Sequence, residues 1–356
     1  MGEDPVILCR DSGGRIRAFL NMCRHRGNRV CRADSGNAKY FVCSFHGWGY
    51  TSEGKLVSVP GIKEYYREEL DLDRWGLVEV AQLETYKGLI FATFDPATPP
   101  LLEYLGGHER HLDLALDRRA GGTEVIGGVH KWVIQANWKY GAENFFGDDG
   151  HHPITHASVR RAMPDDRFYT QSNEENVMRE DDPLSVLPAG IIRDYYREHF
   201  PELVDRVGPE RARQSHLVTT VFPNCSLNFG RHMVRVWHPR GPNRTEIWSY
   251  FLVDKDAPPE VKDAMRLHLT QTFGPAGNVE EDDMDNWVQC TETGRGAVAR
   301  RYLQNIQAGL GHDADLPAVG GGFRLRAFYA RWADLMDAPD WSRVAIDIYP
   351  WRLPWK

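Results

Sequence analysis

Short hydrophobic runs alternate with turn-forming residues through the first hundred positions of the chain. The runs at residues 6–9, 40–43 and 88–94 are separated by polar, glycine-containing stretches such as 11–14 and 35–37. Strands of this length between such turns are typical of a small all-β unit. The pattern therefore predicts that the N-terminal part of the chain is a β domain.

This pattern ends at residues 95–100, where three prolines interrupt the chain. Proline lacks a backbone N–H and disfavours regular structure in the residue before it, so the last strand stops here. We expect a domain boundary at this point, with one domain at residues 1–97 and a second at residues 98–356.

The second domain mixes two periodicities. Strand-like runs at residues 217–222 and 245–253 lie among helical stretches at 132–146, 260–273 and 324–336. Such a mixture predicts an α+β domain. The fold class expected for the whole chain is therefore α+β, with a small all-β domain followed by a larger α+β domain.

The helix predicted at residues 260–273 has clear ends. Pro258 and Pro259 favour a helix start, and the Gly-Pro pair at 274–275 stops the run. Three apolar side chains recur on one face of this helix: Val261, Met265 and Leu269. This spacing predicts a stripe that packs against the core.

Composition narrows the class of protein. The 356 residues carry 43 Lys and Arg against 50 Asp and Glu, a formal net charge of −7, which argues against nucleic acid as a partner. No segment approaches the roughly 18 apolar residues of a membrane span, and no signal-peptide pattern opens the chain. The expected location is therefore cytoplasmic, without a membrane partner. Six cysteines are too few for a disulfide scaffold, so some are expected to be metal ligands or buried thiols.

The most specific motif pairs Cys23 and His25 with Cys43 and His46, with 17 residues between the pairs. Each pair offers one thiolate and one imidazole, whereas in zinc fingers the two cysteines usually come first and the two histidines follow. Two cysteines on one iron and two histidines on the other is the ligation of a Rieske [2Fe–2S] centre. A structural zinc site remains the alternative at this point.

Other residues of the two loops suit a cluster. Gly27 and Gly47 follow the histidines, where a chain that turns tightly around a cluster benefits from a missing Cβ. Trp48 and Tyr50 are expected to shield one side. Through C-R-H and C-S-F-H-G-W the sequence resembles the Rieske non-heme iron aromatic-ring-hydroxylating oxygenases, although this motif alone does not separate them from simple Rieske electron carriers.

Residues 148–156 hold a second set of candidate ligands, with three histidines and two aspartates among nine residues. On an unbroken helix, positions five apart point about 140° away from each other, so His151 and His156 would not easily share a metal. Pro153 is expected to break the helix and let His156 return toward His151. Asp148 stands three residues before His151, where its carboxylate is placed to accept the second ring N–H of a metal-bound imidazole.

Two histidines need a carboxylate to complete the facial triad of a non-heme Fe(II) oxygenase. The acidic run at residues 280–285 supplies candidates. Taken alone, such a run is more simply interpreted as a helix N-terminus, which acidic residues favour. Beside His151 and His156, it is the expected source of the third ligand.

The resemblance becomes close at this point. The pattern N-W-K-x-x-x-E-N-F-x-G-D-x-x-H-x-x-x-x-H, followed by F-G-P-A-G-x-x-E-x-D-D, is similar to the catalytic α subunits of naphthalene- and biphenyl-type dioxygenases. Matched residue by residue, the family's iron ligands fall on His151, His156 and Asp283, and no family role falls on His152. The resemblance also implies a bridging aspartate, a pocket asparagine and two pocket walls, which are Asp148, Asn144, Phe145 and Phe273.

The resemblance covers nearly the whole chain and implies two cofactors, a [2Fe–2S] Rieske cluster and a mononuclear non-heme Fe(II). It implies a helix-grip, START-like catalytic domain behind the Rieske domain. Family members usually carry some tens of residues before the region that begins here at Met1, so we expect the Rieske domain to be N-terminally truncated.

The resemblance also implies partners and a reaction. No G-x-G-x-x-G follows a predicted strand, so electrons are expected to come from NAD(P)H through an external reductase or ferredoxin. The assembly implied is α3β3 with a small β subunit, or an α3 trimer, in which Asp148 joins an iron-ligand histidine to the cluster histidine His46 of the next subunit. Both atoms of O2 would add to one face of an aromatic ring to give a cis-dihydrodiol.

Two rival functions use the same motifs. A Rieske monooxygenase or demethylase would have the same metals, and a non-enzymatic Rieske electron carrier fused to a ligand-binding domain would lack the second iron.

The sequence leaves open whether Arg231, Arg235 and Arg324 point inward, toward a substrate carboxylate, or outward to water. The remaining cysteines are expected to be buried thiols: Cys9, Cys31, Cys225 and Cys290.

Overall fold

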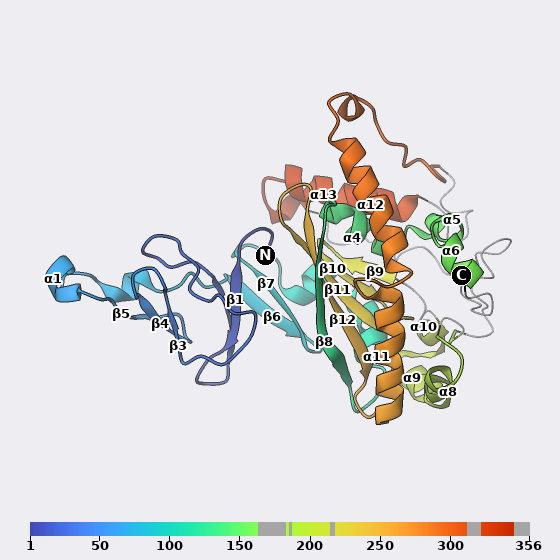
Figure 1. The fold of residues 1–356 in the computed structure, drawn as a ribbon, viewed down its shortest axis with the longest axis horizontal. Helices are drawn as coiled ribbons and strands as arrows, with labels where there is room; N and C mark the ends of the chain where they lie inside the picture. The colour runs from blue at the N-terminus through green and yellow to red at the C-terminus, as the bar shows by residue number, and fades with distance from the viewer. Residues whose placement is uncertain (163–182, 185–186, 214–217, 312–321, 345–356) are drawn as a thin grey trace. The chain divides into compact units, whose positions relative to one another are not determined.

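The structure is a computed structural model, which describes residues 1–162, 183–184, 187–213, 218–311 and 322–344. The chain forms two compact units, Met1–Leu101 and Leu102–Lys356 (Figure 1). Among the helices within the described ranges, none is long and apolar enough to cross a membrane.

The first unit consists of short antiparallel strands, as predicted for an all-β domain. β1 pairs with β2, β3 to β5 form a three-stranded sheet, and β6 pairs with β7. The elements are β1 (Val6–Arg10), β2 (Ile16–Leu20), β3 (Tyr40–Val42), β4 (Gly49–Thr51), β5 (Leu56–Ser58), the helix α1 (Ile62–Tyr66), the 3-10 helix η1 (Leu72–Trp75), β6 (Gln82–Tyr86) and β7 (Leu89–Thr93). Phe19, Phe41, Tyr50 and Leu56 point into one core, which also contains Cys23 and Cys43.

The second unit is built on a five-stranded antiparallel sheet with the strand order β8-β12-β11-β10-β9. Its strands are β8 (Thr123–Ile134), β9 (Val218–Val221), β10 (Cys225–Asn228), β11 (Met233–Pro239) and β12 (Thr245–Asp254). Antiparallel strands with helices on the sheet give the α+β class that the sequence predicts.

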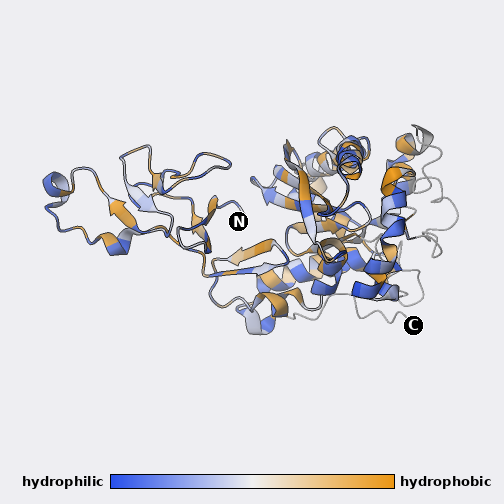
Figure 2. Ribbon diagram, turned by 90° about the horizontal axis from the view of Figure 1, so that it is seen from below, coloured by the Kyte–Doolittle hydropathy of each residue, from blue (hydrophilic) through white to orange (hydrophobic). Residues whose placement is uncertain are grey.

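Helices cover the sheet and connect its strands (Figure 1). They are α2 (Leu101–Leu105), α3 (Glu109–Leu116), α4 (Trp138–Gly147), η2 (Asp149–His151), α5 (His152–Thr155), α6 (Ala157–Ala162), α8 (Ile191–Glu198), α9 (Phe200–Val207), α10 (Pro209–Arg213), α11 (Pro259–Phe273), α12 (Glu280–Gly294), η3 (Ala299–Arg301), α13 (Phe323–Asp337) and η4 (Trp341–Arg343). α4 packs across β9, β10 and β11, and α11 packs against β12 and β8. Hydrophobic and hydrophilic residues alternate along these helices (Figure 2), as expected for elements with one face on a core.

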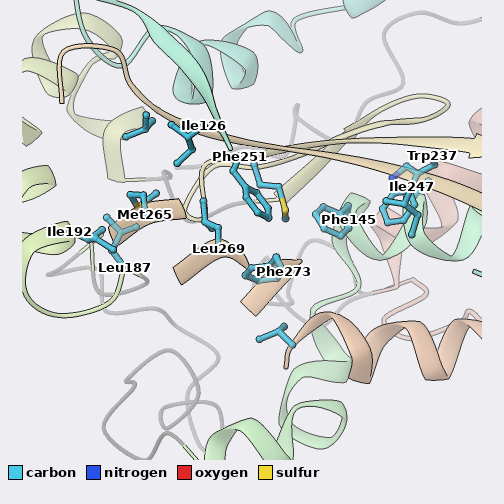
Figure 3. Close-up of a cluster of buried hydrophobic side chains, with 14 of the residues drawn as sticks. Ile126, Phe145, Leu187, Ile192, Trp237, Ile247, Phe251, Met265, Leu269 and Phe273 are labelled. Atoms are coloured by element: carbon cyan, nitrogen blue, oxygen red, sulfur yellow. The ribbon is translucent and has the colours of Figure 1, made fainter. Parts of the chain in front are cut away.

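The core of this unit lies between the sheet and the helices α4, α11, α12 and α13. In Figure 3, Phe251 of β12 lies beside Leu269 and Met265 of α11, and Phe145 of α4 lies between them and Trp237 of β11. The predicted stripe on α11 is confirmed, because Val261, Met265 and Leu269 are all buried. The helix starts after Pro258 and stops at Gly274, as predicted.

Two predictions about the chain were wrong. Residues 132–134 continue strand β8, where Trp132 pairs with Ile247 of β12, and the helix begins only after Asn137. The Asn137 side chain accepts a hydrogen bond from the N–H of Lys139, a typical N-cap.

The expectation of buried thiols also fails at Cys290, which is exposed because it lies beside the face that α12 buries. Cys9, Cys31 and Cys225 are half-buried.

Candidate metal centres

Two loops of nearly identical geometry hold the predicted cluster ligands. In each, the cysteine N–H donates to the carbonyl five residues later, and the glycine four residues later donates back to the cysteine carbonyl, with N···O distances of 2.7–2.9 Å. Gly27 and Gly47 have φ angles of 77° and 74°, in the left-handed region that favours glycine. The repeated loop places Cys23 and Cys43 in equivalent positions.

The four side chains approach one another at the edge of this unit's core, where the cysteines are buried, His25 is half-buried and His46 is exposed. Cys23 and Cys43 are each only 2% exposed, and the ring centroids of His25 and His46 are 4.5 Å apart. Trp48 stacks on His25 with a centroid distance of 5.1 Å, as the expected shield. Nδ1 of His25 is buried and has no hydrogen-bond partner among the described residues.

Polar groups lie close to both sulfur atoms. The Tyr50 hydroxyl lies 3.3 Å from Sγ of Cys23, and the amide nitrogen of Asn28 lies 3.7 Å from Sγ of Cys43. Burial opposes ionisation of Cys43, but the backbone N–H of Phe45 and the Asn28 amide outweigh it and lower the pKa of this thiol. Burial, together with His46, lowers the pKa of His25, which keeps its imidazole neutral. A Cys43 thiol with a lowered pKa beside Cys23, and a neutral His25 beside His46, fit the two-cysteine, two-histidine ligation of a [2Fe–2S] cluster.

The second centre follows the end of α4. The helix stops at Gly147, whose φ of 140° is in the range that favours glycine, and Asp148 is its C-cap. A Cβ at Gly147 would lie 2.2 Å from Cδ of Arg324, so this position has no room for a side chain. The predicted helix break at Pro153 is wrong, because α4 already ends at Gly147, before His151. Pro153 stands in the first turn of α5, where proline is tolerated.

The turn brings the predicted triad together. Nε2 of His151 is 3.3 Å from Oδ1 of Asp283, and Nε2 of His156 is 3.4 Å from the same oxygen. The side chain of Asp283 is 9% exposed and that of His156 is 2% exposed. Two imidazole nitrogens therefore face one carboxylate oxygen in a largely buried position.

His152 belongs to the same cluster. The ligand atoms of His151, His152 and His156 all lie within 4.8 Å of one another. Burial, reinforced by the other two imidazoles, lowers the pKa of His152 to about 3. The pKa of His156 is also lowered by burial, whereas hydrogen bonding to Asp283 outweighs burial and raises the pKa of His151.

The other predicted site residues surround these imidazoles. The amide nitrogen of Asn144 is 3.5 Å from Nε2 of His151. Nδ1 of His151 bonds to the backbone carbonyl of Asp148, while the carboxylate of Asp148 is 3.6 Å away and half-exposed. The main chain of Asp148 thus makes the hydrogen bond that was expected of its side chain. Phe145 and Phe273 are both buried in the adjoining core (Figure 3).

The structure also answers the question about the arginines. Arg231, Arg235 and Arg324 are 3%, 0% and 8% exposed, so none of them points outward to water. The partner of Arg235, which the sequence did not reveal, is Glu280 at 2.6 Å. The contact of Asp282 with His156 was not predicted either: its Oδ2 is 3.5 Å from Nδ1 of His156. Both acids lie in the acidic run that was expected to supply a ligand.

Comparisons with known families match both parts of the chain. The Rieske [2Fe-2S] domain family matches residues 1–86, and the ring hydroxylating alpha subunit (catalytic domain) family matches residues 101–338. The chain belongs to the ring-hydroxylating oxygenase alpha subunits. It is accordingly a Rieske non-heme iron oxygenase, the terminal oxygenase component of its system, and its cofactors are a [2Fe–2S] cluster and a mononuclear iron.

Curated relatives of this alpha subunit are dioxygenases. It is 40% identical to the biphenyl 2,3-dioxygenase subunit alpha of Rhodococcus jostii (strain RHA1), over 97% of this chain and 81% of the relative. It is 38% identical to the benzene 1,2-dioxygenase subunit alpha of Pseudomonas putida, over 97% of this chain and 83% of the relative. The predicted family and enzyme class are thus confirmed.

Solved structures agree with these relatives. A naphthalene 1,2-dioxygenase with indole in its active site superimposes with a TM-score of 0.86 at 35% identity, covering 99% of this chain and 85% of that chain. A quaternary ammonium Rieske monooxygenase, CntA, has a TM-score of 0.61 at 13% identity, covering 92% of this chain and 80% of that chain, and shares the fold alone. Since the matched alpha subunits are components of multicomponent systems, this chain also works with partner proteins.

Proposed function

We propose that this alpha subunit holds mononuclear Fe(II) with His151, His156 and Asp283 and dihydroxylates an aromatic ring. The observation that carries the proposal is the position of Oδ1 of Asp283, 3.3 Å from one imidazole nitrogen and 3.4 Å from the other. Two ligands bound to one metal at about 2.1 Å and at right angles are about 3 Å apart. The observed spacing is close to this value, and a 2-His-1-carboxylate face leaves other coordination positions open.

The ionisation state of His156 supports a metal site. A histidine must be neutral to bind a metal, and the lowered pKa of His156 keeps its imidazole neutral. His151 has its second nitrogen engaged by the carbonyl of Asp148, which leaves Nε2 to face Asp283. This arrangement fixes the tautomer of a ligating histidine.

His152 is the competing third ligand, since its imidazole lies in the same cluster. We assign the third position to Asp283 because its oxygen faces both Nε2 atoms and because a carboxylate offsets part of the charge of Fe(II) in a buried site. Asn144 would lie beside the ligating nitrogen of His151, at the edge of the substrate pocket. Phe145 and Phe273 would form apolar walls of that pocket.

When bound, the cluster stores an electron and the mononuclear iron activates dioxygen. The protein's own part is to hold the imidazoles oriented, to exclude water with buried side chains, and to place an aromatic ring beside Asn144. The names of the relatives favour an aromatic hydrocarbon as substrate and a cis-dihydrodiol as product. Both oxygen atoms of O2 would then enter the product.

The partners we propose are a small β subunit, in an α3β3 assembly or an α3 trimer, and a ferredoxin or NAD(P)H-dependent reductase. The half-exposed carboxylate of Asp148 is 3.6 Å from Nδ1 of His151. Its exposure suits the proposed bridge from His151 to His46 of the next subunit. A relative from Pseudomonas putida, 37% identical over 96% of this chain and 83% of the relative, is named the large oxygenase component of a naphthalene 1,2-dioxygenase system.

Iron content tests the ligand set. We expect His151→Ala and Asp283→Asn to lose mononuclear iron while the colour and the EPR signal of the reduced cluster persist. Asp285→Asn is the matched control, because it removes one exposed charge from the same acidic run. Retention of full iron in Asp283→Asn, with loss in His152→Ala, would assign the third ligand to His152 instead.

Labelled dioxygen tests the reaction. A dioxygenase places two labelled atoms in each product molecule, whereas a monooxygenase or demethylase places one there and releases the other as water. A Rieske electron carrier with a ligand-binding domain would contain no iron beyond the two atoms that accompany its acid-labile sulfide. Either result would refute the proposed reaction.

A further inference from the structure

Three separate segments carry the proposed carboxylate ligand and the walls of the iron site: the last turn of α4, the end of α11 and the start of α12. Arg235 on β11 contacts all three. Its Nη1 donates to Oε1 of Glu280 at 2.9 Å, and its Nη2 lies 2.6 Å from Oε2 of the same residue. Nη2 also donates to the backbone carbonyl of Phe273 at 3.1 Å, and Cζ lies 5.0 Å from the ring centroid of Phe145.

The position of Glu280 links this contact to the metal. Glu280 is the first residue of α12, and Asp283 follows one turn later, so the two carboxylates share the buried side of the helix. Val279, the N-cap, makes no side-chain cap hydrogen bond. The contact with Arg235, one hydrogen bond and one close ion contact, is therefore a side-chain anchor at this end of α12, and it resists rotation of the helix about its axis.

The same guanidinium also fixes the connection that precedes α12. Phe273 is the last residue of α11, and only residues 274–279 separate it from Glu280. Arg235 therefore clamps both ends of this connection. The main chain at Phe273 and the first turn of α12 are thereby held by one side chain.

We propose that Arg235 is a positioning residue, which sets the direction of the Asp283 carboxylate toward iron and ties the Phe273 wall to it. The proposal rests on the assignment of Asp283 as a ligand. Stability alone does not account for the contact, because apolar residues of similar volume often replace a buried ion pair with no loss of stability. Arg235 and Glu280 are 0% and 1% exposed, so the pair is a buried one of this kind.

The experiment separates positioning from folding. Arg235→Met alone leaves Glu280 buried without its partner and is expected to lower thermal stability. In the double variant Arg235→Met/Glu280→Leu both charges are gone, so we expect a melting temperature near that of the wild type. The wild type and each variant, as full chains with their partner proteins, are then titrated with ferrous iron alone to measure iron affinity. The product formed per O2 consumed is measured in a second assay.

We expect the double variant to bind ferrous iron about 10- to 100-fold more weakly, the range seen when groups that orient a ligand are removed. We also expect less product per O2 and a fall in kcat, with the cluster signal unchanged. Arg235→Lys keeps the charge but not the planar fork, so its iron affinity should fall between those of the wild type and the double variant. Arg240→Met/Glu246→Leu is the matched control, since it removes a half-buried pair of 2.7 Å between the residue after β11 and β12, and it should change none of these quantities.

The proposal would be overturned if both the double variant and Arg235→Lys kept an iron affinity and a product yield within twofold of the wild type. If the double variant fails to fold, Arg235→Lys alone decides by the same criterion. Should Asp283→Asn keep its iron, the ligand assignment fails. Loss of iron in Asp283→Asn, together with normal iron in the Arg235 variants, refutes only the role of Arg235.

Discussion

Glu143 gives the sharpest prediction about stability. It lies on α4 next to Asn144, and its Oε2 is buried without a hydrogen-bond partner among the described residues. Burial raises the pKa of this carboxyl from 4.5 to about 7, against the opposing effect of a hydrogen bond from Tyr329. The folded protein therefore holds a proton on Glu143 at pH values where the unfolded chain has lost it.

The sign of the pH effect follows directly. Between pH 4.5 and about 7 the folded state binds more protons than the unfolded state, so the free energy of unfolding falls as pH rises and levels off above pH 7. At 1.36 kcal/mol for each pH unit, the difference in pKa corresponds to a loss of up to about 3 kcal/mol. Glu143→Gln has the same shape and no charge at any of these pH values, so it escapes this loss.

Thermal denaturation of both proteins between pH 5 and pH 8 measures the effect. We expect similar melting temperatures near pH 5 and a Glu143→Gln variant that is more stable by several degrees at pH 8, at about 2–4 °C for each kcal/mol in a domain of this size. Glu281→Gln, an exposed acid on α12, is the control and should follow the wild type throughout. Parallel curves for the wild type and Glu143→Gln would refute the reasoning.

Three further predictions concern the two metal centres. Asp148→Asn should leave cluster and mononuclear iron bound but stop product formation, and a normal product yield would exclude the proposed bridge. Gly147→Ala forces a Cβ against Arg324 at an unfavourable φ, so it should lower the free energy of unfolding by about 1–3 kcal/mol in a denaturation assay. Gly150→Ala is the control, because a Cβ there would have no side-chain atom closer than 4.0 Å, and it should lower the free energy of unfolding much less. Tyr50→Phe removes the hydroxyl 3.3 Å from Sγ of Cys23. Loss of one such hydrogen bond should lower the midpoint potential of the [2Fe–2S] cluster by about 20–60 mV in a redox titration. An unchanged potential would show that the hydroxyl does not donate to the sulfur.

The cluster loops were predictable because their geometry is local. Each ligand pair and its glycine lie within a few residues, and the hydrogen bonds that shape the loop join positions four and five apart. The ends of α11 were predictable for the same reason, since Pro258 and Gly274 act on their immediate neighbours. In these segments the sequence contains nearly all the groups that determine the structure.

The second centre was predicted for a partly wrong reason. His151 and His156 do approach one another, with ring centroids 5.4 Å apart, but the helix ends at Gly147 and not at Pro153. The side chain that packs against Gly147 is Arg324, which is distant in sequence, so a local argument could not find it. The extension of β8 through residues 132–134 likewise depends on pairing with β12, more than a hundred positions away.

The acidic run at the start of α12 shows how two competing interpretations can both apply. Its first four residues have different surroundings because successive helix positions turn by about 100°. Glu280 is buried against Arg235, Asp283 faces the two imidazoles, Asp282 lies near Nδ1 of His156, and Glu281 is exposed. The run is thus a negatively charged helix start, as the simpler interpretation held, and also the source of the proposed ligand. Neutralising each acid should therefore have a different effect, although the four changes in charge are the same.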